Sequence, residues 1–218
     1  MGKTKAGWLV VLLCVTLGAA SCARVRRSVG LGGEDLLATG LVGWQQIGGE
    51  QGNWQIEDGI LSAQGQGGWL STVRQYDDFE LSLEFCVAPE GNSGVFLRAP
   101  HRGDPAYVGM EIQIIHDRAD QWRHLKPNQY TGSIYDVQAP SERASKRANE
   151  WQTMTIRCEG PRVTVVLNGQ EVVDTSTTYF RYRHEAHPGL TRRTGYIGLQ
   201  DHGGGVEFRN IRIKSLTD

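Results

Sequence analysis

Hydrophobic and polar residues alternate over several short segments of this chain. In residues 79–87 every second side chain is apolar, and Glu80, Ser82 and Glu84 stand between them. A period of two residues is typical of a β-strand that buries one face and exposes the other to water. The pattern therefore predicts antiparallel sheets with one face on a hydrophobic core.

The rest of the chain predicts many short strands joined by tight turns. Asp58-Gly59 and Asn168-Gly169 are typical of two-residue hairpins, because both positions of a type I′ turn require a positive φ. The 28 glycines and the scarcity of helical periodicity also favour an all-β fold. The predicted strands are residues 54–57, 60–63, 69–71, 79–87, 94–98, 108–116, 152–158, 162–167, 170–174, 196–200 and 206–213.

The start of the chain has the features of an export signal. Lys3 and Lys5 precede an apolar run over residues 6–17, and small residues follow it. The run is shorter than the roughly 20 residues that a membrane span needs. We therefore expect residues 1–21 to be a signal peptide and the chain to be exported.

Cys22 follows small residues, as the modified cysteine of a bacterial lipoprotein does. Ala19 stands where leucine is commoner in that motif, and ordinary signal cleavage nearby is the alternative. A lipidated Cys22 would carry more than one acyl chain, which is what stable attachment to a membrane requires. The expectation is a bacterial cell-envelope lipoprotein, periplasmic or on the outer-membrane face. Residues 22–40 would be a tether and residues 41–218 one β-sandwich domain.

Charge and cysteine content narrow the class of protein. The chain has 23 Lys and Arg against 24 Asp and Glu, and loss of residues 1–21 with Lys3 and Lys5 would change the net charge from −1 to −3. That balance argues against nucleic acid as a partner, because such proteins usually show a basic patch. Cys86 and Cys158 lie in predicted strands and can pair in an exported protein. We expect two separate buried thiols, and no CxxC motif indicates a cysteine-based zinc or redox site.

Two predicted strands carry polar rows that are candidates for a ligand site. Glu111, Gln113 and Asp117 are expected on one face, with Glu111 and Asp117 roughly 20 Å apart, so that they would flank an extended ligand. Gln200 and His202 share a face just before three consecutive glycines. Imidazole can act as a general acid or base near neutral pH. The alternative for each row is an ordinary solvent-facing side of an antiparallel sheet.

Arg98 closes another predicted strand, on the face expected for Gly94 and Phe96. A guanidinium there can orient a ligand oxygen or pair with Glu111. A structural salt bridge is the alternative.

Two long irregular stretches, residues 117–150 and 175–194, interrupt the strands. Long loops in a compact domain are often functional. Trp122, Tyr130 and Tyr135 in the first stretch are candidate platforms for sugar rings, because aromatic faces match the apolar faces of pyranoses. Packing within the loop is the alternative for each of them.

A series of short motifs resembles the DUF1080 family in the same order along the chain. The resemblance runs from about residue 41 to residue 216, and no single motif decides it. The closing motif, residues 195–212, reads Gly-Tyr-Ile-Gly-Leu-Gln-Asp-His-Gly-Gly-Gly-Val-Glu-Phe-Arg-Asn-Ile-Arg. The other motifs lie at residues 43–44, 54–61, 68–72, 79–81, 92–98, 109–114, 131–135 and 167–169.

The resemblance implies a concanavalin A-like β-sandwich, a jelly roll of two antiparallel sheets with a concave sugar-binding face. It also implies activity on 3-keto-glycosides, as a 3-keto-disaccharide hydrolase or as a 3-keto-glucoside 1,2-lyase with glycal hydratase activity. The expected route is removal of the C2 proton, β-elimination of the glycosidic oxygen and hydration of the product. The expected partner is therefore an oligosaccharide or 3-keto-glycoside substrate.

The expected roles follow from face and family motif. Glu111 and His202 would be the catalytic acid and base, in either order. The residues expected to hold the substrate are Arg98, Gln113, Asp117, Tyr135 and Gln200, with Arg98 near the enolate. A divalent cation held by Glu111 and His202 is an alternative to Arg98 in that role.

Three other functions fit the same sequence. A carbohydrate-binding module can use the same fold without catalysis, because concanavalin-like folds host both lectins and glycosidases. A conventional two-carboxylate glycosidase would need a second carboxylate near Glu111, and no motif supplies one. A purely structural envelope protein predicts a packed surface in place of a cleft.

Overall fold

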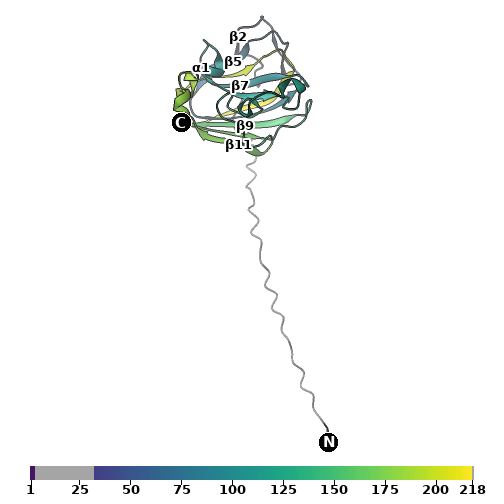
Figure 1. The fold of residues 1–218 in the computed structure, drawn as a ribbon. Coiled ribbons are helices and arrows are strands. Elements are labelled where there is room, and N and C mark those ends of the chain that lie inside the picture. Colours follow the sequence, from purple (N-terminus) through teal and green to yellow (C-terminus); the bar gives the residue numbers. More distant parts are fainter. Residues whose placement is uncertain (3–31, 218) are drawn as a thin grey trace.

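The computed structural model describes residues 1–2 and 32–217. Cys22 and nearly all of the predicted signal peptide lie outside these residues. Most of the regular secondary structure of the described chain is β-strand, and the strands lie in two layers (Figure 1). None of its described helices is long and apolar enough to cross a membrane.

An eight-stranded antiparallel sheet forms one layer, in the order β11-β10-β9-β6-β13-β4-β3, with β1 paired to β13. A five-stranded antiparallel sheet, in the order β2-β5-β12-β7-β8, forms the other. The larger sheet contains β1 (Glu34–Asp35), β3 (Trp54–Glu57), β4 (Ile60–Ala63), β6 (Phe79–Val87), β9 (Gln152–Glu159), β10 (Arg162–Leu167), β11 (Gln170–Ser176) and β13 (Val206–Ser215). The smaller sheet contains β2 (Trp44–Ile47), β5 (Trp69–Tyr76), β7 (Asn92–Ala99), β8 (Met110–Ile115) and β12 (Gly195–Gln200).

Short helices occupy the connections. The α-helix α1 (Pro105–Val108) lies between β7 and β8. The 3-10 helices are η1 (Asp120–Trp122), η2 (Pro127–Gln129), η3 (Thr177–Arg183) and η4 (Pro188–Thr191). The sandwich of two antiparallel sheets confirms the predicted all-β, concanavalin A-like jelly roll.

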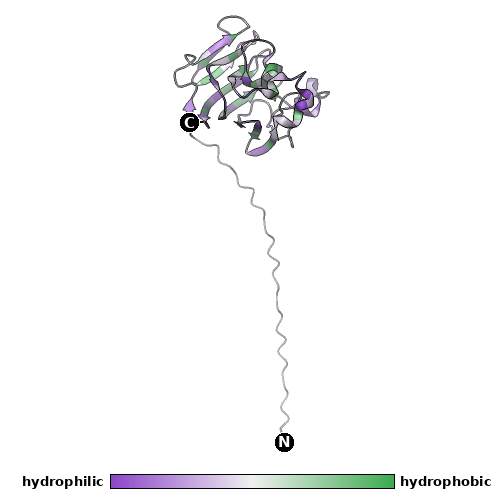
Figure 2. Ribbon diagram, turned by 90° about the vertical axis from the view of Figure 1, so that its left-hand side faces the viewer, coloured by the Kyte–Doolittle hydropathy of each residue, from purple (hydrophilic) through white to green (hydrophobic). Residues whose placement is uncertain are grey.

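The hydrophobic core fills the space between the two sheets. In β6 the alternation places Phe79, Leu81 and Phe85 in this core, fully buried. Figure 2 shows hydrophobic and hydrophilic positions interleaved along the strands. Each sheet thus has one face in the core, and the outer face of the smaller sheet is left free to carry polar residues.

Both predicted two-residue hairpins are present. Asp58 and Gly59 have φ of 49° and 77° between β3 and β4, and Asn168 and Gly169 have φ of 50° and 81° between β10 and β11. These left-handed conformations are the ones that a type I′ turn requires. The turns fix the register of the strands on either side of them.

The domain begins earlier than the sequence predicted. Strand β1 pairs with β13, and Leu36 and Leu37 pack against the core. The prediction of a tether over residues 22–40 is therefore wrong for residues 34–37, because Glu34 and Asp35 join the larger sheet and Leu36 and Leu37 bury apolar surface.

The two cysteines in the described part of the chain are free thiols. The Cys158 side chain points from β9 into the hydrophobic core, where burial raises its pKa to about 12. Cys86 is partly exposed on β6, near the opposite end of the β6–β9 pair, since Phe79 is the residue opposite Cys158. The expectation of two separate thiols holds, although only Cys158 is fully buried.

Candidate functional site

Strand β8 contributes a carboxyl and an amide to the outer face of the smaller sheet. Glu111 and Gln113 alternate with Ile112 and Ile114, whose side chains enter the core. Gly94 of β7 lies opposite Gln113, and a Cβ atom at Gly94 would come within 2.1 Å of Oε1 of Glu111. The missing side chain at Gly94 therefore makes room for the Glu111 carboxyl to lie on the sheet.

The end of β12 contributes Gln200 and His202. The intervening Asp201 is buried, and its carboxylate accepts hydrogen bonds from Asn53 Nδ2 (2.8 Å), Gly67 N (2.9 Å) and Gly204 N (2.7 Å). These bonds fix the turn that follows β12. The side chains on either side of Asp201 are thereby held at the edge of the outer face.

Tyr135 reaches the same place from the loop after β8. Its backbone N–H donates to the carbonyl of Glu111 (2.8 Å), and Gln113 N donates to the carbonyl of Ser133 (3.1 Å). An isolated bridge between Ile112 and Ile134 continues this pairing. The segment acts as a short extension of the sheet and places the Tyr135 ring beside the Glu111 side chain.

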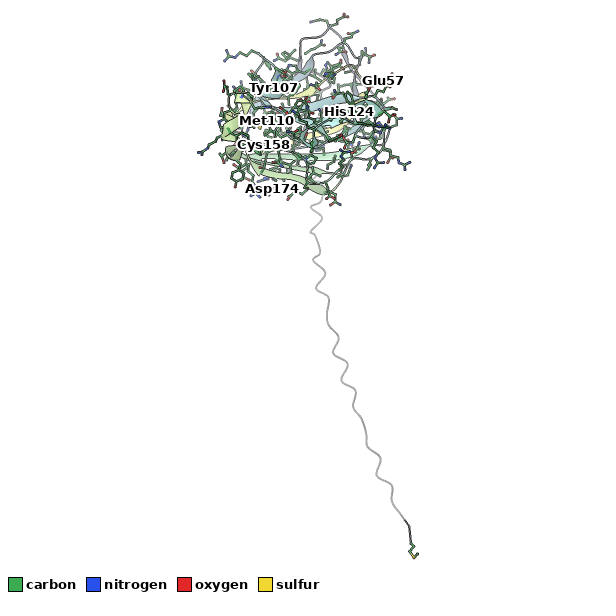
Figure 3. The ribbon with its side chains drawn as sticks, viewed as in Figure 1. Glu57, Tyr107, Met110, His124, Cys158 and Asp174 are labelled. Atoms are coloured by element: carbon green, nitrogen blue, oxygen red, sulfur yellow. The ribbon has the colours of Figure 1, made fainter. Side chains whose placement is uncertain are left out.

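The connection between β7 and β8 forms another wall. Asp104 caps α1 by accepting a hydrogen bond from Ala106 N (3.0 Å), and Tyr107 follows on the helix. The rings of Tyr107 and Tyr135 meet edge to face, with centroids 6.4 Å apart. Tyr107 is found above Met110 in the view of Figure 3, and the Met110 side chain enters the core.

These elements enclose a pocket of about 210 Å³ on the outer face of the smaller sheet. Five of the seven substrate-handling residues predicted from the sequence line it: Glu111, Gln113, Tyr135, Gln200 and His202. The structure therefore brings together residues from β8, from the loop after it and from the end of β12. The other lining residues are Asn92, Asp104, Ala106 and Tyr107.

Glu111 is the most perturbed acid of the pocket. Its side chain is 3% exposed and has no hydrogen-bond or ion-pair partner among the described residues. Burial, with a further contribution from the charge of Asp104, raises the pKa of Glu111 to about 8. The carboxyl is therefore mostly protonated at neutral pH, and it can donate a hydrogen bond as well as release a proton.

Two neighbours of Glu111 present hydrogen-bond donors. Gln113 Oε1 accepts from Ile114 N (2.9 Å), which leaves the amide NH2 group to face a ligand. Tyr135 Oη accepts from Gln129 Nε2 (3.2 Å), which leaves the phenol O–H to donate. Burial raises the pKa of Tyr135, so this phenol keeps its proton. The pocket can thus offer several donors to one oxygen atom.

Arg98 does not reach the pocket, and its predicted role near an enolate is corrected. Its side chain is 0% exposed and donates to the carbonyls of Asp77 (2.9 and 2.7 Å) and Gly160 (2.7 Å) and to Oδ1 of Asp78 (3.0 Å). The residue has a φ of 50°, which breaks the strand alternation and turns its side chain away from the face of Gly94. Arg98 forms a structural salt bridge with Asp78, which was the alternative to a ligand-binding role.

Asp117 is also outside the pocket. Strand β8 ends at Ile115, so the alternation that predicted a shared face with Glu111 does not extend to Asp117. Its carboxylate accepts hydrogen bonds from Thr131 N (3.0 Å), Thr131 Oγ1 (2.7 Å) and Ser145 Oγ (2.8 Å). Asp117 fastens the loop that carries Tyr135, and it supports the site only indirectly.

Asp104, Tyr107 and Asn92 are pocket residues that the sequence reasoning missed. The Asp104-Pro105 pair is a recognisable helix start, since Asp is a good N-cap and Pro suits the first helical position. That signal predicts a cap and says nothing of a ligand. Tyr130, a predicted sugar platform, is buried instead, with the Arg143 guanidinium 3.6 Å from its ring centroid.

The residues present do not fit the metal site considered from the sequence. Among the described residues, no group of three or more His, Cys, Asp or Glu side chains is placed to hold a metal ion. Glu111 is mostly protonated at neutral pH, so a cation would have to displace that proton, and the described residues offer too few further ligands to hold it. We therefore derive no catalytic step through a cation.

Residues 34–214 match the family described as the 3-keto-alpha-glucoside-1,2-lyase-like domain. A 3-keto-disaccharide hydrolase from Bacteroides thetaiotaomicron is 26% identical over 216 residues, which cover 80% of this chain and 74% of that protein. A proposed glycosyl hydrolase from Parabacteroides distasonis superposes with a TM-score of 0.71 at 28% identity, over 79% of this chain and 99% of that one. The luminal domain of VIP36, bound to calcium and mannose, shares the fold alone, with a TM-score of 0.51 at 12% identity over 81% of this chain and 84% of that one.

Proposed function

Because the chain belongs to the family of 3-keto-alpha-glucoside-1,2-lyase-like domains, we propose that it is an enzyme that cleaves 3-keto-glycosides. The relatives support a carbohydrate-active function in general. One observation carries the more specific proposal: Glu111, Gln113, Tyr135, Gln200 and His202 converge on one pocket.

The chemistry of a 3-keto sugar explains why such a pocket is needed. A carbonyl at C3 makes the C2 proton acidic, because the resulting carbanion is delocalised as an enolate. Loss of that proton allows the glycosidic oxygen to leave from C1. The site must therefore supply a base for the C2 proton, donors for the enolate oxygen and a proton for the leaving oxygen.

Glu111 and its neighbours provide the donors in this proposal. Protonated Glu111 donates a hydrogen bond to the C3 oxygen, and the Gln113 amide and the Tyr135 hydroxyl donate to the same region. A buried carboxyl kept neutral at pH 7 is a known means of stabilising an enolate. These neutral donors have the role near the enolate that was predicted for Arg98.

His202 is the proposed base. It stands at the exposed mouth of the pocket, where neutral imidazole takes the proton from C2. The enolate then collapses, the C1–O bond breaks, and the imidazolium returns the proton to the leaving oxygen. Gln200 holds sugar hydroxyls beside it. The product is an unsaturated 2-hydroxy-3-keto sugar, and hydration of its double bond completes a net hydrolysis.

The decisive experiment is incubation of the protein with a 3-keto-disaccharide and with the unoxidised parent sugar. Cleavage of the keto sugar alone, with or without a chelator, is expected, and a transient unsaturated product would show elimination. Glu111→Gln should abolish turnover, whereas the exposed Glu185→Gln serves as the matched control. Binding of the sugar without any product would contradict the proposal and favour a carbohydrate-binding module.

Export and lipid anchoring through Cys22 form a separate proposal, supported by the sequence of residues 1–22. Expression in a bacterium fed a labelled fatty acid should label the wild-type chain and leave Cys22→Ala unlabelled. Equal labelling of both chains would contradict a lipid anchor at Cys22.

A further inference from the structure

We infer that Asp104 is a second catalytic carboxylate of this pocket, placed to activate the water that adds to C1 of the unsaturated intermediate. The inference rests on the proposed function and extends it to the hydration step. It assigns a role to a residue that lies outside every motif of the sequence resemblance.

The placement of Asp104 leaves one carboxylate oxygen available. Oδ1 accepts the capping hydrogen bond from Ala106 N, and no hydrogen bond or ion pair of Oδ2 occurs among residues 32–217. Asp104 is solvent-exposed and lines the pocket at the start of α1. Water can therefore reach the carboxylate that faces the site.

The loop that carries Asp104 is anchored to the sheet by His101. The His101 ring stacks on Tyr196, with centroids 3.6 Å apart and planes 14° apart. Ser71 Oγ donates to the carbonyl of Thr72 (2.9 Å) and accepts from His101 Nε2 (2.8 Å), while Gln45 Nε2 donates to His101 Nδ1 (3.0 Å). This pattern suits a neutral imidazole and fixes the loop three residues before Asp104.

Glu111 is the second carboxyl group that acts with Asp104 in this pocket. It is the buried, unpartnered carboxyl of the same pocket, and the negative charge of Asp104 contributes to its raised pKa. The pocket therefore holds one carboxyl that is mostly protonated and one carboxylate. A protonated carboxyl and a carboxylate in one site are suited to opposite roles in proton transfer.

The proposed hydration step balances without any further reactant. The water oxygen forms a bond to C1 while Asp104 Oδ2 takes one of its protons. The π electrons of the C1–C2 double bond move toward C3 and form an enolate, which Glu111 stabilises. Asp104 then returns the proton to C2, so that the carboxylate is regenerated and the sum is the addition of one water.

Asp104→Asn tests this role with little risk to the fold, because Asn is as good an N-cap as Asp. On a 3-keto-disaccharide, the wild-type protein should release the hydrated 3-keto sugar, whereas D104N should accumulate the unsaturated 2-hydroxy-3-keto sugar. Loss of the base is expected to slow hydration on the order of 100-fold. Asp120→Asn, at an exposed surface carboxylate paired with Arg123, should keep the wild-type ratio of products.

Two outcomes would overturn the inference. One is a wild-type ratio of products from D104N. The other is no consumption of substrate by D104N where the wild-type protein consumes it, which would make Asp104 part of the cleavage step. Failure of the wild-type protein to cleave any 3-keto-glycoside would contradict the proposed function instead. NMR titration of the Glu111 carboxyl tests the electrostatic coupling between the two carboxyl groups. The pKa of Glu111 must fall in D104N, because the negative charge of Asp104 is removed.

Discussion

Replacement of Glu111 by Gln should stabilise the protein and remove its activity. The pKa of Glu111 rises from 4.5 to about 8 on folding, so the folded chain holds a proton that the unfolded chain releases. The stability that this carboxyl contributes is fully present below pH 4.5 and is lost as the pH rises toward 8. A neutral, isosteric amide avoids that loss.

The size of the gain follows from the two pKa values. Linkage at 1.36 kcal/mol for each unit gives a stabilisation by Glu111→Gln of about 1 kcal/mol at pH 5 and about 3 kcal/mol at pH 7. A domain is typically stable by about 5–15 kcal/mol, so the gain at pH 7 is a large fraction of the total. The gain should level off above pH 8, where the folded chain also releases the proton.

Urea unfolding of wild-type and variant proteins at pH 5, 7 and 9 measures this difference. Glu185→Gln, at an exposed site, should change the unfolding free energy by less than about 0.5 kcal/mol at every pH. A constant difference between Glu111→Gln and wild type from pH 5 to pH 9 would refute the reasoning, because the carboxyl would then not be held protonated by the fold.

Three further predictions concern the support of the pocket and of the fold. Gly94→Ala places a Cβ atom on the Glu111 carboxyl and should lower kcat by about 100-fold with the fold intact, as judged by circular dichroism. Arg98→Ala removes the buried guanidinium that binds the carbonyls of Asp77 and Gly160 and the Asp78 carboxylate, and it should lower the unfolding free energy, measured in urea, by about 3–5 kcal/mol. A change below about 1 kcal/mol would contradict its structural role. His101→Ala should raise KM for a 3-keto-disaccharide by about tenfold, whereas His101→Gln, which can still donate to Ser71, should recover most of the loss; equal KM values in all three proteins would argue against the anchor.

The fold was accessible from the sequence because its signals are local. The alternation in residues 79–87 and the turn at Asn168-Gly169 depend only on neighbouring residues, and both predict the strands that the structure contains. The same reasoning placed Gln200 and His202 at the end of a strand, where the pocket lies.

The failures share a physical cause, since each depends on where regular geometry ends. Arg98 leaves its predicted face because one positive φ reverses the alternation, and a single sequence does not signal that conformation at an arginine. Asp117 fails because β8 stops two residues earlier. Asp104 was missed because only the path of the loop over the sheet brings it to Glu111.

The two-residue strand β1 has a mechanical consequence. Glu34 and Asp35 are paired with Ile213 and Arg212, and Leu36 N adds one hydrogen bond to Ile211 O (2.8 Å). A force applied to the chain ahead of residue 34 would therefore load this short contact before it loaded the long strands of the sandwich. The β1–β13 pairing would break first and lengthen the extended segment ahead of the sandwich by several residues. The sheet that bears the pocket would keep its shape.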